Sequence, residues 1–251
     1  MTANSQRGKQ FMTIPAQANW KPLDRGIYVS AAMAICALVV AGFWPSYFSK
    51  LFSAESQPLT VLVHVHGALM TAWIALFVVQ VLLVTMGRVD LHRRMGVLGF
   101  ALLTLILIVA VPTTIVATKL GGHHMPGPAL PGLALVIAAF TEFITLGSLG
   151  LFYRHRSDIH KRLMVLATFA ATDAGVARLP FDFLDSIAKV HLANDLVLFA
   201  VVAIDTARHR RLHPAFLWGS AFLVALQTLS AWLSGTEWWM RTAQEIMSNF
   251  Q

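Results

Sequence analysis

Long apolar runs separated by short polar segments dominate the chain. A helix that crosses the hydrocarbon core of a bilayer needs about 20 mostly apolar residues. Seven runs meet this length: 27–48, 60–86, 94–118, 130–153, 161–179, 189–207 and 214–234. The pattern therefore predicts an all-α integral membrane bundle of seven transmembrane helices over residues 26–234. A polar N-terminal tail (1–25) precedes it, and a Trp-containing interfacial tail (235–251) follows it.

Composition agrees with a membrane location. Hydrophobic residues make up 57% of the chain and charged residues only 12%, whereas a soluble domain has about 25% charged residues. The formal net charge of +7 would fit nucleic-acid binding, but the basic residues lie in short segments between apolar runs, where they orient helices. We therefore expect a lipid bilayer as the partner and no nucleic acid. The N-terminus lacks the pattern of a removable signal peptide.

The distribution of basic residues predicts the orientation. With the N-terminus in the cytoplasm, 14 of the 19 Lys and Arg residues fall on the cytoplasmic side and 5 on the other side. The side that is richer in Lys and Arg is normally cytoplasmic. An odd number of spans then places the C-terminus outside, in agreement with seven. We expect a multi-pass protein of the bacterial cytoplasmic (inner) membrane.

A short motif occurs twice, at 90–94 (DLHRR) and 158–162 (DIHKR), each time before a long apolar run. Asp is a strong helix N-cap, and its charge suits the positive end of the helix dipole. We therefore expect Asp90 and Asp158 to cap two membrane helices at the cytoplasmic face. Each motif joins two spans into a hairpin, so spans two to five are expected to form a pseudo-symmetric four-helix core.

The histidines of the two motifs, His92 and His160, are candidate ligands. The helix dipole disfavours protonation of a histidine at a helix start, which favours the neutral, ligating ring. The alternative is that each motif consists only of a cap and basic anchors that fix the topology, with histidine as an interfacial residue.

Several polar residues lie inside the apolar runs, where ionisable groups are costly and indicate function by default. Glu142 is near the middle of its run, so it should be protonated or partnered. His191 and Asp195 are four residues apart on one helix face and fit an oriented ligand or a plain hydrogen bond. The sequence also fits a structural ion pair, either between Asp173 and Arg178 or between Arg178 and Asp195. Gln80 and Thr141 fit interhelical hydrogen bonds.

The histidines fall into two groups when sorted by predicted side. His92 and His160 lie toward the inner face, and His66 lies toward the outer face with either His191 or His124 as its partner. Two histidines from facing helices can hold a low-spin haem, with nearby Arg and Lys side chains meeting the propionates. We therefore expect a b-type haem bound by histidines from the set His66, His92, His160 and His191.

A copper or zinc site at the outer face is the competing interpretation. His64 and His66 form a His-x-His pair, and His123 and His124 lie in a Gly- and Pro-rich loop on the same predicted side. Imidazole nitrogens suit either metal. The sequence alone leaves open whether His64 or His66, and His124 or His191, is the outer ligand.

Residues 61–180, with HVHGALM, then HRRMG and HKRLM, resemble a family of uncharacterised bacterial multi-pass membrane proteins. HGALM followed by HRRMG one helix later is also distantly similar to the ascorbate-reducible diheme b-type cytochromes. That resemblance implies haem ligation at His66, His92 and His160; the run 130–153 contains no histidine to match a fourth ligand. The pattern His-basic-x-Leu-Met is similar to small oxidase-assembly membrane proteins.

Three functions remain open on these grounds. The first is a b-type haem protein that moves electrons across or within the membrane, with a quinone or a respiratory-chain protein as partner. The second is a metal- or haem-handling assembly factor for a respiratory complex. The third is a transporter or structural membrane subunit without a cofactor. No nucleophile–base motif, phosphate-binding loop or HExxH motif is present, which argues against hydrolysis.

Overall fold

The structure is a computed structural model that describes residues 22–52, 59–119 and 129–249. Its elements are α1 (Pro22–Phe43), η1 (Trp44–Phe48), η2 (Ser49–Leu51), α2 (Val61–Thr85), α3 (Val89–Lys119), α4 (Ala129–Phe152), α5 (Ser157–Ala170), α6 (Asp173–Val176), α7 (Ile187–His209), α8 (Pro214–Ser234) and α9 (Glu237–Ser248). No strand occurs within these ranges. The all-helical fold predicted from the apolar runs is confirmed.

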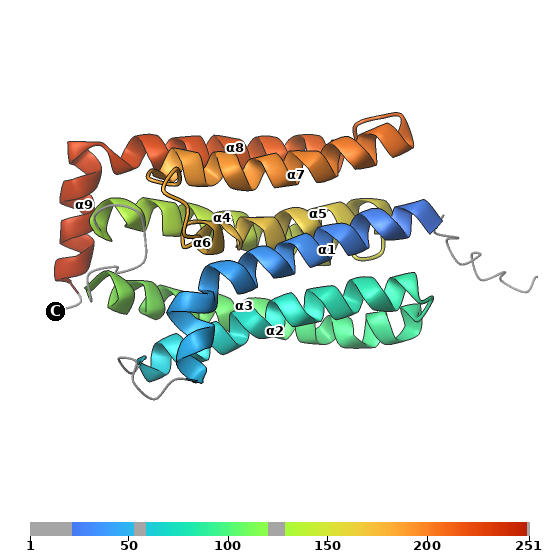
Figure 1. Cartoon of the computed structure of the whole chain (residues 1–251), viewed down its shortest axis with the longest axis horizontal. Coiled ribbons are helices and arrows are strands. Elements are labelled where there is room, and N and C mark those ends of the chain that lie inside the picture. Colours follow the sequence, from blue (N-terminus) through green and yellow to red (C-terminus); the bar gives the residue numbers. More distant parts are fainter. Residues whose placement is uncertain (1–21, 53–58, 120–128, 250–251) are drawn as a thin grey trace, which may run out of the picture.

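The long helices run side by side along one axis, and successive helices point in opposite directions (Figure 1). Six of them are long and apolar enough to cross a membrane: α1 together with its short extension to Leu51, α2, α3, α4, α7 and α8. The chain is therefore a multi-pass membrane protein. The helix α9 lies across the end of the bundle opposite to the start of α1 (Figure 1).

The predicted fifth span, 161–179, is not one continuous helix. It consists of α5, which has 14 residues, a break at Ala171 and Thr172, and the single turn α6. A helix of 14 residues is about 21 Å long, which is shorter than the hydrocarbon core of about 30 Å. At the break the hydroxyl of Thr172 donates to the carbonyl of Phe169 at 2.6 Å, so a side chain satisfies a carbonyl at the helix end.

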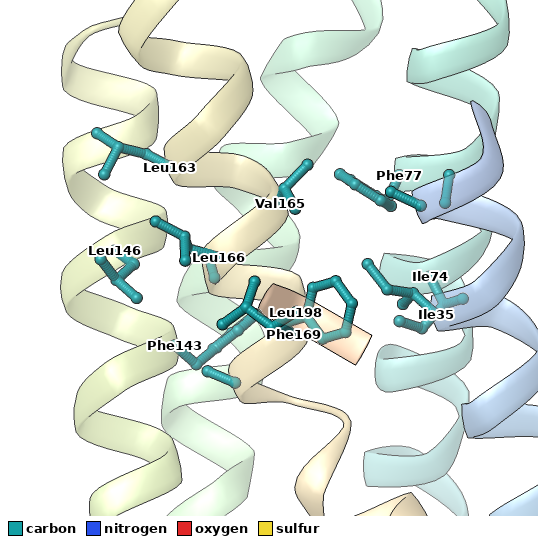
Figure 2. Close-up of a cluster of buried hydrophobic side chains, with 14 of the residues drawn as sticks. Ile35, Ile74, Phe77, Phe143, Leu146, Leu163, Val165, Leu166, Phe169 and Leu198 are labelled. Carbon is teal, nitrogen blue, oxygen red and sulfur yellow. The ribbon is translucent and has the colours of Figure 1, made fainter. Parts of the chain in front are cut away.

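The core is wider than the four helices predicted from spans two to five. Eight of the nine residues from Arg162 to Ala170 of α5 are buried, and the apolar cluster around them also draws on α1, α7 and α8. Figure 2 shows Leu166 and Phe169 of α5 between side chains of α4 and those of α1 and α2. Because the second half of α5 is buried on nearly all sides, it lies at the centre of the bundle with other helices around it.

The two motif copies begin their helices in the same register. α3 and α5 each start one residue before the acidic residue, so Asp90 and Asp158 lie in the first turn and are not the N-caps that we expected. A carboxylate in the first turn still interacts favourably with the helix dipole. His92 and His160 are each the fourth residue of their helix. The repeat in sequence is therefore also a repeat in structure.

Candidate functional site

The two motif histidines lie next to each other at the end of the bundle where α3 and α5 begin. The ring centroids of His92 and His160 are 6.1 Å apart, and the ring planes are inclined by 74°. Residues 68 positions apart in the sequence are thus neighbours, because the α2–α3 and α4–α5 hairpins turn at the same end of the bundle (Figure 1). We call these two residues the histidine pair.

The backbone orients one ring of the histidine pair. Nδ1 of His160 lies 2.7 Å from the carbonyl oxygen of Gly150. A carbonyl can only accept, so Nδ1 carries the proton and donates it, which leaves the Nε2 lone pair available. Ligating histidines normally hold their second ring nitrogen in this way.

The surroundings of His92 leave polar atoms without partners. Its Nδ1 is buried and has no hydrogen-bond partner in the described part of the chain, and the same holds for Oε1 of Gln80. The side-chain amide of Gln80 donates to the carbonyl oxygen of His92 at 3.2 Å, which is the kind of interhelical hydrogen bond predicted for Gln80. Thr141, in contrast, donates to Ile137 of its own helix. Buried polar atoms without partners are costly, so those beside His92 require an explanation.

The donor set of the histidine pair fits haem better than a bare metal ion. Within the described ranges, no group of three or more His, Cys, Asp or Glu side chains could hold a metal ion. A protein-bound zinc ion needs at least three such ligands, whereas haem brings its own nitrogens and needs only axial ligands from the protein. One turn along α3 from His92, a Cβ atom on Gly96 would meet nothing within 4 Å.

The basic residues of the two motifs differ in their roles. Arg93 and Arg94 are exposed at the start of α3, where they could meet an anionic group. Lys161 lies over the ring of Tyr28, 4.6 Å from its centroid. Arg162 is buried and bound to Asp205, so the prediction that the basic pair of the second motif meets haem propionates is wrong for Arg162.

Asp205 is a residue that sequence reasoning missed. Its carboxylate receives hydrogen bonds from Nε and Nη2 of Arg162 at 2.7–3.0 Å and from the hydroxyl of Tyr28 at 3.0 Å. These contacts join α7, α5 and α1 in the core. The available signal was an acidic residue inside an apolar run, which requires a partner.

The outer histidines do not form a second pair of this kind. Nδ1 of His191 lies 3.0 Å from a carboxylate oxygen of Asp173 and forms a hydrogen bond with it. This hydrogen bond joins His191 to α6 and not to Asp195, which the spacing had predicted as its partner. His66 is on α2, which packs against α1 and α3, and α1 also packs against α7. No ring contact between His66 and His191 occurs in the described part of the chain.

The competing outer metal site is only partly described. His64 is exposed and its ring centroid lies 6.1 Å from that of Tyr47. His66 is partly buried, and its Nδ1 has no partner among the described residues. His123 and His124 lie outside the described residues, so the copper or zinc interpretation that depends on them stays a prediction.

A second polar cluster surrounds the break between α5 and α6. Asp173 receives hydrogen bonds from the side-chain amides of Asn194 at 2.5 Å and Gln227 at 3.5 Å, in addition to its contact with His191. The hydroxyl of Thr172 has one hydrogen, which it shares between the carbonyl of Phe169 and Oδ1 of Asn194, 2.7 Å away. The charges of Glu142 and Asp195 act on each other and both interact with Asp173. We call the following residues the acidic cluster: Glu142, Asp173, His191, Asn194, Asp195 and Gln227.

Sequence reasoning missed two members of this network, Thr172 and Gln227. Both are polar residues within apolar runs, which is the signal that could have identified them.

No family model, no curated protein and no solved structure matches this chain. The site must therefore be interpreted from its own geometry.

Proposed function

We propose that this protein binds a b-type haem between His92 and His160 and transfers electrons at the cytoplasmic face of a bacterial inner membrane. The observation that carries the proposal is the histidine pair itself: two imidazoles from equivalent positions of two helices, with centroids 6.1 Å apart. When bound, a haem with two histidine ligands supplies one-electron chemistry. This proposal extends the function expected from the repeated motif.

The orientation is part of the proposal. Six helices qualify as spans, and we count α5 with α6 as a seventh, interrupted crossing, because α5 runs antiparallel to α4 along the bundle (Figure 1). With the N-terminus in the cytoplasm, 14 of 19 Lys and Arg residues fall on the cytoplasmic side, in agreement with the positive-inside rule. The histidine pair then lies at the cytoplasmic end.

The protein side chains have distinct tasks in this proposal. His160 ligates through Nε2, because its Nδ1–H is held by Gly150. His92 would supply the second ligand to the haem iron, which would provide one-electron chemistry. Arg93 and Arg94, exposed one and two residues after His92, meet the anionic edge of the cofactor.

One haem site at the cytoplasmic end favours electron exchange at that face over transfer across the whole bilayer. His191 is engaged with Asp173 and does not complete a second histidine pair with His66. We propose a membrane quinone or a respiratory-chain protein as the partner that supplies or accepts the electron.

An optical spectrum of the purified protein tests the proposal. A reduced-minus-oxidised difference spectrum is expected to show b-type haem bands that His92→Ala and His160→Ala each abolish. His155→Ala is the matched control, because His155 is exposed in the turn before α5 and should leave the bands unchanged. Wild-type protein purified from haem-sufficient cells without haem bands would overturn the proposal.

A further inference from the structure

We infer that the bundle contains a proton-binding site centred on Glu142, separate from the histidine pair. Glu142 lies on α4 with 0% of its side chain exposed. Neither of its carboxyl oxygens has a hydrogen-bond partner in the described part of the chain. A buried carboxylate without a partner costs several kcal/mol of free energy, and a proton removes that charge.

The neighbours of Glu142 strengthen this argument, because they are acidic. The charged groups that act on it are Asp173 of α6 and Asp195 of α7. Asp173 is well supplied with donors, since His191, Asn194 and Gln227 all contact its carboxylate. Three ionised carboxylates with one histidine among them would repel each other in a low-dielectric interior.

The unpartnered atoms of the cluster are acceptors. They are Oε1 and Oε2 of Glu142, Oδ1 of Asp195, Oε1 of Gln227 and Nε2 of His191. When His191 donates from Nδ1 to Asp173, its Nε2 is also an acceptor. All four residues are at most 8% exposed. The acidic cluster therefore has more acceptor atoms than hydrogen-bond donors, and a proton on a carboxyl group turns an acceptor into a donor.

A proton fits this cluster better than a metal ion does. No three His, Cys, Asp or Glu side chains of the described chain are placed to hold a metal ion. The amide groups of Asn194 and Gln227 donate to Asp173, so donors occupy the carboxylate that an adjacent cation would need as a ligand. The missing ligand therefore has to supply a hydrogen-bond donor and neutralise one carboxylate.

The break between α5 and α6 brings this cluster together. Asp173 is the first residue of α6 and follows the interrupted turn at Ala171 and Thr172. A continuous helix would carry Asp173 in a different direction. Interrupted membrane helices commonly place ion-binding groups in the interior of transporters. The role of the break is therefore to bring together the groups that bind the proton. Asp195 is the group that exchanges the proton with Glu142.

Infrared spectroscopy of the full-length protein in detergent or lipid tests the inference. Wild type at neutral pH is expected to show the carbonyl stretch of a protonated carboxylic acid, shifted in D₂O. Glu142→Gln should abolish this band. Glu237→Gln is the control, because Glu237 is exposed on α9, and this variant should keep the band.

Two results would overturn the assignment: absence of the band in wild type, or its persistence in Glu142→Gln. A band lost in Asp195→Asn but kept in Glu142→Gln would place the proton on Asp195 instead. Thermal unfolding gives a second measurement, because Gln is a neutral isostere of a protonated Glu. Glu142→Gln should leave the unfolding midpoint unchanged or raise it, whereas a marked decrease would indicate an ionised Glu142. The His92→Ala variant should keep the infrared band. A failure of the haem proposal can therefore be distinguished from a failure of this inference.

Discussion

The backbone of α1 touches the backbone of α6 at Gly42 and Gly175. A Cβ atom on Gly42 would overlap the carbonyl group of Gly175, and a Cβ on Gly175 would lie 3.3 Å from the carbonyl oxygen of Leu38. Two glycines on facing helices allow this approach because neither has a side chain. The contact holds α6, and with it Asp173, against the bundle.

Gly42→Ala should therefore destabilise the protein. The new methyl group meets backbone atoms, which cannot rotate away, so α1 and α6 must separate. Overpacking of this kind costs about 1–3 kcal/mol. Thermal unfolding in detergent measures it. Gly26→Ala in the same helix is the control, because a Cβ there meets nothing within 4 Å; equal midpoints for the two variants would contradict the close approach.

The buried ion pair of Arg162 and Asp205 predicts a strong effect of single substitutions. The side chains are 3% and 0% exposed, with Nη2 and Oδ2 2.7 Å apart. Removing one member leaves the other charge buried and costs about 3–5 kcal/mol. We expect Arg162→Met to lower the unfolding midpoint strongly. Lys189→Met is the control, because its ion pair with Asp185 is exposed and its loss should have little effect.

A double variant separates the effect of the buried charges on stability from the effect of side-chain packing. Replacing both members by apolar residues removes the buried charges together. Arg162→Met combined with Asp205→Leu should therefore be more stable than either single variant. If the losses of the two single variants simply add, the pair does not act as a unit and this account of the core is wrong.

The environment of His213 predicts that the folded protein loses stability in acid. The backbone N–H of Ala215 donates to Nδ1 of His213 at 3.1 Å, so the proton of the neutral ring is on Nε2, 3.4 Å from Asp158. Burial and the charge of Arg162 lower the pKa of His213 below 6.5, and its contacts with Asp158 and the charge of Asp205 offset this only in part. Because the folded state binds the proton more weakly, this contribution to stability is present above pH 6.5 and is lost as the pH falls below it.

His213→Asn tests this pH dependence, since Asn can still accept the capping hydrogen bond but does not titrate. Lowering the pH from about 7.5 to about 5.5 should reduce the unfolding midpoint less in this variant than in wild type. The same reduction in both proteins would show that another group is responsible.

The apolar runs and the repeated motif predicted the helices and the proximity of His92 and His160, because both follow from local patterns. The break after Ala170 was not predicted, because the run 161–179 is long enough for one membrane helix and contains no proline. What fixes the break is the side-chain bonding of Thr172 to Phe169 and Asn194, and Asn194 is 22 residues away.

The partners of the buried polar groups also could not be predicted from the sequence. Arg162 and Asp205 are 43 residues apart, and nothing local links them. His191 was expected to bond to Asp195 one turn away, but the break in the preceding helix turns Asp173 toward it. Local spacing identifies which polar residues need partners; the packing of distant helices decides which partners they obtain.

The spin state of the proposed haem iron tests most directly whether His92 and His160 ligate the same iron. Low-temperature electron paramagnetic resonance of the oxidised wild-type protein should give a low-spin signal, because two imidazoles complete six-coordination. Substituting either histidine by alanine should convert any haem that remains bound to a high-spin form, or release it. A low-spin signal that survives in both single variants would contradict the account, because the ligands would then lie elsewhere.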